Sequence, residues 1–340
     1  MKSVGLDVGS YAIKVASGKL SGDKLGIELV LEEPNPAGTL LPADPQLREQ
    51  LVEKIKQIWQ VNDLPTRNIR ASLPESTLVT KVINMPKLSD AELASAIHWQ
   101  IEQHIPIPYE ELQYEYTVLR RIESESEPSM DVLVIGVQKN YVQGVADLFL
   151  EAGLDVTSLE SDTIAQLRCL ESNLPVGQNN ALLYIGATNS TVNIISDNVL
   201  SLVYTFPIAG FLFTRSIEQA LQLSPARAEE YKRSFGLLED QMEGKIRNAL
   251  LPTVRSLVAE VQKAIHYFQS QHIDQSINKL YVYGGSQYLP DLFTFLSENL
   301  GLEVAPVRLS EQSNLVWPNQ VAQDSRFVTA LGLALKDIKG

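Results

Sequence analysis

The sequence predicts an α/β fold made of two related lobes, and three observations lead to this prediction. The chain has 340 residues, which is too long for one ordinary hydrophobic core. Residues 4–17 read as an apolar strand, a turn at 7–10 and a second strand. Residues 181–195 repeat this strand–turn–strand arrangement about halfway along the chain. An arrangement that occurs once in each half indicates a duplicated lobe.

The first turn, Asp-Val-Gly-Ser at 7–10, carries groups that suit a phosphate and a hydrated cation. Asp7 offers a carboxylate to the cation, and Gly9 lets the backbone approach a phosphate. Ser10 and Lys14 can donate hydrogen bonds to phosphate oxygens. A dinucleotide-binding turn would need Gly-x-Gly-x-x-Gly and then a helix, but residues 13–16 alternate like a strand. The alternative interpretation is a plain hairpin.

Composition excludes several classes of protein. The formal charge of −13 argues against a nucleic-acid surface and against direct attachment to anionic lipid. One cysteine, Cys169, excludes an intramolecular disulfide and a Cys-based zinc site. No run approaches the ~20 apolar residues of a spanning helix. The chain also begins directly with a strand, so we expect no signal peptide and a cytoplasmic protein without direct membrane insertion.

Local signals place the elements of the first half. Asp44 can cap a helix over 45–60, and strands are expected over 69–73 and 79–83. The Ser-Asp-Ala-Glu sequence at 89–92 has capping-box spacing.

A helix opens at this capping box and carries an apolar residue at every fourth position up to Ile105. Strands over 112–118 and 132–137 follow, separated by an acidic loop at 123–130. Residues 86–158 therefore read as a helix–strand–strand–helix insertion within the first lobe.

The second half begins after the Asn-, Pro- and Gly-rich segment 173–180. Its expected elements are strands over 181–185 and 192–195, a long core-packing helix within 239–272, a strand over 280–283, a turn at 284–286 and helices over 290–299 and 326–338.

Three small-residue turns, at 7–10, 186–191 and 284–286, each follow an apolar strand. Their order resembles the actin-like ATPase superfamily, in which two phosphate loops precede a late Gly-Gly turn against the adenosine. Glu229 and Lys232 resemble an acid and a base that this superfamily places near the ribose and adenine. Taken alone, such an i, i+3 pair would ordinarily be a surface ion pair.

The insertion resembles one branch of this superfamily more closely. Residues 88–111 carry Glu-Leu, Ala-Ile-x-Trp, Glu and Ile-Pro-x-Pro in the order found in PilM, the FtsA-related, actin-like family of type IV pilus assembly proteins. Residues 159–165 and 283–286 also match, so the resemblance spans essentially the whole chain. It implies an actin-like ATPase fold with two duplicated lobes and an inserted FtsA/PilM-type subdomain in the first lobe.

The resemblance implies boundaries and ligands. The first lobe would be 1–85 and 159–177, completed by a C-terminal helix at 326–340, with the insertion at 86–158 and the second lobe at 178–325. Mg²⁺ would lie near Asp7, through water. The residues implied to hold ATP are Gly9, Ser10, Tyr11, Lys14, Gly186, Ala187, Thr188, Asn189, Glu229, Lys232, Gly284, Gly285 and Ser286.

The resemblance also implies partners. The family binds the short cytoplasmic N-terminal peptide of PilN, a bitopic membrane protein, as an extended segment between the first lobe and the insertion. Other pilus platform proteins and motor ATPases are further expected partners. The chain would thereby be held at the inner membrane through its partners, and no nucleic acid is expected.

One departure from the family bears on catalysis. The second phosphate loop usually begins Asp-Ile-Gly, and Tyr184 stands here at the Asp position. A phenol is neither a carboxylate base at neutral pH nor a good magnesium ligand. Glu160, between the phosphate-loop regions, could supply a carboxylate and is the candidate catalytic residue. We expect at most slow ATP hydrolysis.

Two other functions stay open. A small-molecule kinase of the same superfamily would need a carboxylate base, which the loop at Tyr184 does not offer. An FtsA-like cell-division filament protein would carry a C-terminal membrane-targeting helix, and the end of this chain, Ala-Leu-Lys-Asp-Ile-Lys-Gly, lacks that character.

Overall fold

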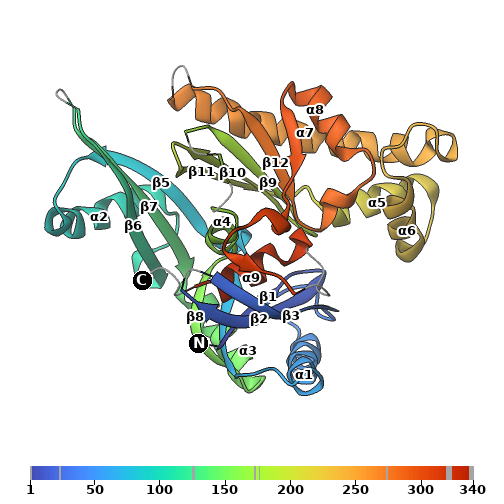
Figure 1. Cartoon of the computed structure of the whole chain (residues 1–340), viewed down its shortest axis with the longest axis horizontal. Helices are drawn as coiled ribbons and strands as arrows, with labels where there is room; N and C mark the ends of the chain where they lie inside the picture. The colour runs from blue at the N-terminus through green and yellow to red at the C-terminus, as the bar shows by residue number, and fades with distance from the viewer. Residues whose placement is uncertain are drawn as a thin grey trace. The chain divides into compact units, whose positions relative to one another are not determined.

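The computed structural model describes residues 2–22, 24–124, 127–171, 174–175, 177–272, 275–318 and 324–336. Residue contacts divide the chain into two units (Figure 1). Unit 1 contains Met1–Asn173, Ser310–Gln323 and Phe327–Gly340, and unit 2 contains Leu174–Leu309 and Asp324–Arg326. None of the helices within the described ranges has the length and apolar character that crossing a membrane requires.

A six-stranded sheet organises unit 1, in the order β14-β3-β2-β1-β4-β8. Antiparallel pairing joins β1 to β2 and β2 to β3, whereas β4 runs parallel to both β1 and β8. The strands are β1 (Lys2–Val8), β2 (Ala12–Ser21), β3 (Lys24–Pro34), β4 (Asn68–Leu73), β8 (Asp155–Ser161) and β14 (Leu315–Val316).

Helices cover both faces of this sheet (Figure 1). On one face, α1 (Pro45–Val61) and α3 (Lys139–Glu151) bury their apolar sides in a core shared with alternate residues of β1. The predicted cap of α1 is present, because Asp44 accepts a hydrogen bond from the N–H of Gln46 at 2.8 Å. On the other face, α4 (Asp162–Leu170) and α9 (Val328–Ala334) pack against each other, α9 also against β1 and α4 against β8 and β4.

Two glycines make the close packing of α9 possible. A Cβ on Gly332 would lie 1.8 Å from the backbone oxygen of Ala165 in α4. A Cβ on Gly5 in β1 would lie 2.1 Å from the backbone oxygen of Ala330. Only residues without a side chain permit these approaches, so the C-terminal helix is fitted closely to unit 1.

A second, three-stranded antiparallel sheet belongs to unit 1, in the order β5-β7-β6. Its strands are β5 (Val79–Pro86), β6 (Leu112–Ile122) and β7 (Ser129–Gln138). Helix α2 (Asp90–His104) begins at the predicted capping box and lies on one face of the sheet (Figure 1). Its Leu93, Ile97 and Ile101 fill the core beneath it.

This subdomain differs from the expected range 86–158 at both ends. Strand β5 begins at Val79 and pairs along its length with β7, so the sheet starts earlier. Helix α3 contributes Val145, Leu148 and Phe149 to the core of the six-stranded sheet, so it packs with the lobe. The three-stranded sheet with α2 is formed by residues 79–138. The predicted acidic loop includes residues 125–126, which lie outside the described residues.

Unit 2 contains a five-stranded sheet in the order β11-β10-β9-β12-β13. Its strands are β9 (Asn180–Ile185), β10 (Ser190–Ser196), β11 (Val199–Phe206), β12 (Lys279–Tyr283) and β13 (Glu303–Pro306). Its helices are α5 (Gly210–Leu221), α6 (Pro225–Phe235), α7 (Lys245–Gln271) and α8 (Leu292–Leu300). The long helix α7 buries one apolar side against the sheet, as predicted for a core-packing helix.

The predicted second-lobe boundary at 325 differs from the contact units. Residues 310–323 group with unit 1, because Leu315 and Val316 pair with Leu25 and Gly26 of β3. The final helix is described as α9, Val328–Ala334, and residues 337–340 lie outside the described residues. Short 3₁₀ turns connect the elements at Glu75–Thr77, Tyr109–Glu111, Met242–Gly244, Gly285–Tyr288, Leu309–Glu311 and Ser325–Phe327.

Candidate nucleotide site

The first predicted turn is closed by its own backbone and held by Asn35. The N–H of Gly9 donates to the oxygen of Ala12 at 3.0 Å. The Asn35 amide donates to the backbone oxygens of Gly9 at 2.8 Å and Thr39 at 3.1 Å, and its backbone N–H reaches the oxygen of Tyr11. Sequence reasoning missed Asn35. Its position in Asn-Pro-Ala-Gly, a turn-forming sequence, was the available signal.

Asp7 and Lys14 face each other across the β1–β2 pair. The register places the two residues opposite one another, and Lys14 Nζ lies 3.2 Å from Asp7 Oδ2. The Ser72 hydroxyl lies 3.5 Å from the other oxygen of Asp7. The structure therefore brings together the predicted cation ligand and the predicted phosphate donor. Ser10 is half-buried and Tyr11 is exposed beside them.

Two carboxyl groups that sequence reasoning missed lie close to each other, and one of them, Asp162, lies near Asp7. Asp162, at the start of α4, accepts a hydrogen bond from the N–H of Glu75 at 3.1 Å. Ser161 donates to the Glu75 carboxyl at 2.6 Å. Burial raises the pKa of Asp162 well above its ordinary value, and the charges of Glu75 and Asp7 raise it further. Burial also raises the pKa of Glu75. Neither residue lies in a sequence pattern that indicates this proximity.

These raised pKa values predict a pH-dependent stability. In the folded protein Asp162 and Glu75 bind protons more strongly than in the unfolded chain, so the free energy of unfolding falls as pH rises above their ordinary values of about 4. Asp162→Asn keeps the acceptor oxygen and removes the charge. We expect its thermal midpoint, relative to the wild type, to increase as the pH rises above about 4. Asp240→Asn, at an exposed carboxyl, is the control, and a parallel pH dependence of all three proteins would contradict this account.

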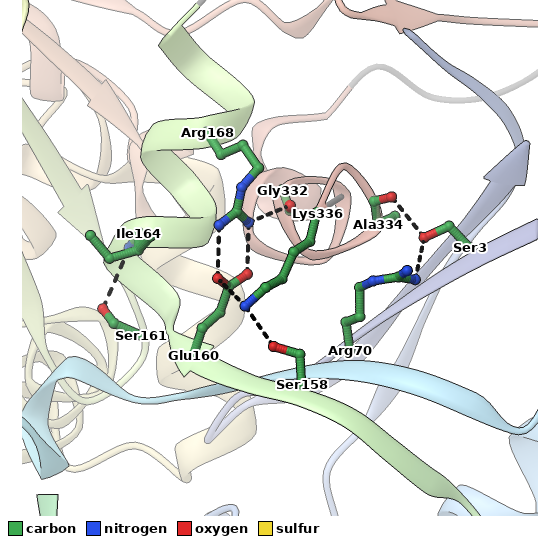
Figure 2. Close-up of polar contacts among 10 residues, drawn as sticks. All are labelled: Ser3, Arg70, Ser158, Glu160, Ser161, Ile164, Arg168, Gly332, Ala334 and Lys336. Carbon is green, nitrogen blue, oxygen red and sulfur yellow. Dashed lines mark hydrogen bonds and ion pairs between the residues drawn. The ribbon is translucent and has the colours of Figure 1, made fainter. Parts of the chain in front are cut away.

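Glu160 is held in an ion-pair cluster (Figure 2). Its two oxygens accept from Arg168 Nη1 at 2.6 Å and Nη2 at 2.7 Å, and Lys336 Nζ approaches at 3.1 Å. Arg168 also donates to the oxygen of Gly332, and Lys336 donates to Ser158. This arrangement differs from the expected catalytic role, because both oxygens are engaged by cations and link β8 to α4 and to the end of α9.

In unit 2, the second predicted turn meets the start of α5. The N–H of Gly186 donates to the oxygen of Asn189 at 3.0 Å, which closes the turn. Gly210 and Phe211 donate from α5 to the oxygens of Gly186 and Ala187. The Ser286 hydroxyl, from the Gly-Gly-Ser turn, also donates to Gly186 at 3.2 Å. The structure thus brings the predicted turns at 186–191 and 284–286 together, with Thr188 and Asn189 hydrogen-bonded to each other.

The ring of Tyr184 lies between the glycines of these two turns. A Cβ on Gly186 would lie 3.0 Å from its Cε1, and one on Gly284 would lie 2.8 Å from its Cε2. Gly284 has a φ of +94°, a conformation that also favours glycine. The Tyr283 ring packs against Tyr184 at 5.4 Å. The phenol that replaces the expected carboxylate is therefore accommodated by both turns.

Glu229 and Lys232 form a partly buried pair on α6. Lys232 Nζ lies 2.6 Å from Glu229 Oε2 and donates to Thr214 and to the oxygen of Gly210. Burial lowers the pKa of Lys232. Burial raises the pKa of Glu229, but hydrogen bonds from Lys232 and Thr214 outweigh it, so the net shift is downward. The pair is not confined to the surface of α6. Lys232 Nζ and Ser286 Oγ both lie close to Gly210 at the start of α5, because a Cβ on Gly210 would lie within 4 Å of each atom.

The residues fit a nucleotide better than a protein-held metal. Glycine turns, hydroxyl groups and ammonium groups suit phosphate oxygens, and a Cβ on Gly285 would meet no atom within 4 Å. Among the described residues, no group of three His, Cys, Asp or Glu side chains could hold a metal ion. A magnesium ion would therefore depend on Asp7 together with water and phosphate oxygens, which agrees with the way Mg²⁺ is usually bound.

Comparisons with known proteins agree over nearly the whole chain. Residues 5–338 match the family model described as "Type IV pilus assembly protein PilM". A solved "PilM-PilN type IV pilus biogenesis complex" is 24% identical, with a TM-score of 0.84 and 99% of each chain covered.

Two further structures are more distant. The ethanolamine utilization protein EutJ from Carboxydothermus hydrogenoformans is 16% identical, with a TM-score of 0.58 and coverage of 98% of this chain and 89% of that one. MreB5 of Spiroplasma citri bound to ADP is 12% identical, with a TM-score of 0.55 and coverage of 97% and 94%. These likenesses confirm the predicted actin-like ATPase fold.

Proposed function

The chain belongs to the PilM family of type IV pilus assembly proteins, and from this premise we propose that it is an actin-like scaffold that binds ATP and the cytoplasmic N-terminal peptide of PilN. The observation that carries the proposal is the family match over residues 5–338. Attachment to the inner membrane would come through PilN. Contacts with other platform proteins and motor ATPases stay predictions.

Nucleotide binding is supported by chemistry within each unit. In unit 1, the glycine turn lies beside the Asp7–Lys14 pair. The Asp7 carboxylate would face a hydrated Mg²⁺, and the Lys14 ammonium group would donate to a phosphate oxygen. In unit 2, Gly210 lies close to Gly186, Ser286 and Lys232. MreB5, which shares the fold, has been solved with ADP. Bound Mg²⁺ would supply charge stabilisation to the phosphates.

Turnover is proposed to be slow. Tyr184 fills the space between the two glycine turns, and its phenol cannot accept a proton from water at neutral pH as a carboxylate does. Glu160 is engaged by Arg168 and Lys336. A scaffold that responds to bound nucleotide needs little hydrolysis, whereas a kinase needs a free carboxylate base.

The three-stranded sheet of unit 1 supports peptide binding. The solved relative is a PilM–PilN complex. The isoleucines of α2 are buried in the core of this subdomain and are not available to a peptide. The outer strand β6 remains as a surface for the peptide, because no described strand pairs with one side of its backbone. Tyr116 on β6 is 37% exposed. An extended peptide added to this edge would gain backbone hydrogen bonds and a contact with the Tyr116 ring.

A synthetic PilN N-terminal peptide with a fluorescent label tests the proposal. We expect it to bind the full chain, with Tyr116→Ala weakening affinity about tenfold, or ~1.4 kcal/mol, through loss of an aromatic contact. Tyr267→Ala, an exposed tyrosine on α7 in unit 2, is the matched control and should bind as the wild type does. Thermal unfolding of both variants should be unchanged. Absence of binding to the wild type, or peptide protection confined to 181–325, would show the proposal to be wrong.

A further inference from the structure

Helix α2 exposes a tryptophan on the side turned away from its own sheet. Leu93, Ile97 and Ile101 occupy the buried side of the helix, whereas Trp99 is 66% exposed. A shallow depression of about 560 Å³ lies beside it, lined by Leu88, Ala91, Glu92, Ser95, Ala96 and Trp99. A large aromatic ring beside an apolar depression is typical of the anchor position of a protein interface.

Other aromatic rings continue from Trp99 toward β6. The His98 ring packs edge-on against Tyr109 at 4.3 Å and lies 6.0 Å from the Trp99 ring. The Tyr109 and Tyr114 rings lie 6.0 Å apart, and their hydroxyl groups are 3.3 Å apart. We call Trp99, His98, Tyr109 and Tyr114 the aromatic strip. Each ring contacts a neighbouring ring, which restricts its rotamers and lowers the side-chain entropy lost on binding.

Acidic groups surround the aromatic strip. Glu92 lines the depression, and its pKa is lowered because Ser89 donates to its carboxylate through both side chain and backbone. Glu110 and Glu111 follow Tyr109 and are exposed, and no described Lys, Arg or His forms an ion pair with either. Lys139 approaches this turn, but it donates to the backbone oxygen of Glu110.

The charge balance of the whole subdomain favours a positive partner. Residues 79–138 contain ten Asp and Glu but only four Lys and Arg. Three of these four, Lys87, Arg120 and Arg121, already pair with acids. The surface that remains around the strip is therefore acidic and aromatic, which suits Lys and Arg through carboxylate contacts and cation–π contacts with Trp and Tyr.

We propose that the aromatic strip and its depression are a docking surface for a short basic segment of a partner protein, which places an apolar side chain beside Trp99 and its cations against Glu92, Glu110 and Glu111. Tyr114 lies on β6, so the aromatic strip adjoins the edge proposed for PilN, but the present proposal concerns the depression beside Trp99 and does not depend on PilN binding. A second copy of this chain or an anionic membrane is disfavoured, because each would bring negative charge to a negative surface.

The test uses the full chain and a labelled amphipathic peptide of Leu and Lys, with a Leu and Glu peptide of equal length as its counterpart. At low salt we expect the Leu/Lys peptide to bind in fluorescence polarisation. Trp99→Ala, and separately Glu110→Lys with Glu111→Lys, should weaken binding at least about tenfold. Leu150→Ala removes an equally exposed apolar side chain from α3 and should leave binding unchanged. Unchanged thermal midpoints would show that all variants fold.

Several outcomes would overturn the proposal. If the Leu/Glu peptide bound as tightly as the Leu/Lys peptide, or if Trp99→Ala bound the Leu/Lys peptide as tightly as the wild type, the surface would not be a docking site for a basic segment. A wild-type dimer that Trp99→Ala converts to a monomer in sedimentation would make the surface a self-association face. Loss of the PilN peptide in Trp99→Ala would make it part of the PilN site, whereas failure of PilN to bind the wild type would concern the proposed function alone.

Discussion

Lys14→Ala is expected to weaken ATP binding about tenfold or more. The ammonium group lies in a nearly buried position opposite Asp7, beside the turn at Gly9 that we propose to receive a phosphate. A hydrogen bond to a charged group contributes ~1.5–3 kcal/mol, and its loss corresponds to roughly a tenfold to hundredfold change in affinity. Isothermal titration calorimetry with ATP and Mg²⁺ measures the effect directly.

Two variants separate this role from a general effect of charge. Lys19→Ala removes an exposed lysine from the same strand, where it pairs with Glu28, and should leave the ATP affinity unchanged. Lys14→Arg keeps the charge and should retain most of the affinity. Lys14→Ala also leaves Asp7 without its cation, so thermal unfolding must be followed in parallel. A folded Lys14→Ala variant with wild-type affinity would remove the assignment of this turn to phosphate.

Local sequence signals predicted much of unit 1. Asp44 and the Ser89–Glu92 capping box begin α1 and α2 as expected, because capping depends on groups within one turn of the helix. The turns at Gly9 and Gly186 were predictable for the same reason. Each closes by a hydrogen bond to a residue three positions later.

Long-range pairing could not be predicted in this way. Strand β14 has two residues, Leu315 and Val316, and is defined only by pairing with β3. The extent of the insertion depends on where α3 packs, and its amphipathic pattern suits either core.

The candidate site shows the same division. Sequence spacing indicated that Asp7 and Lys14 lie close together, because a hairpin places them opposite one another. It also indicated that Glu229 and Lys232 lie on one face of a helix. It did not indicate Asn35, Gly210 or Asp162, whose partners lie far away in sequence. Glu160 was selected for its carboxylate alone. Its partner Lys336 is 176 residues away, so the ion pair became visible only in the folded chain.

Arg168→Ala is expected to lower the free energy of unfolding by about 3 kcal/mol. Removing one partner of a buried ion pair costs ~3–5 kcal/mol, and the lower end applies because Lys336 still contacts Glu160 and the Arg168 side chain is partly exposed. The variant also loses the hydrogen bond to Gly332 that holds α9 to α4. Arg227→Ala, which breaks an exposed pair with Glu230, is the control and should change stability by no more than about 0.5 kcal/mol.

The same cluster decides between a structural and a catalytic role for Glu160. If its function is to neutralise Arg168 and Lys336, Glu160→Gln should destabilise the protein while ATP turnover per folded molecule stays at the wild-type rate. Glu160→Gln combined with Arg168→Met removes both charges of the closest pair and should recover part of the lost stability, because the guanidinium that Glu160→Gln leaves without its acid is removed as well, whereas the Lys336 side chain is 31% exposed and stays partly hydrated. Urea unfolding and a phosphate-release assay on the same samples measure both quantities. Loss of turnover in Glu160→Gln with unchanged stability would instead show that this carboxylate acts on the nucleotide, and the ion pairs with Arg168 and Lys336 would then position it for that role.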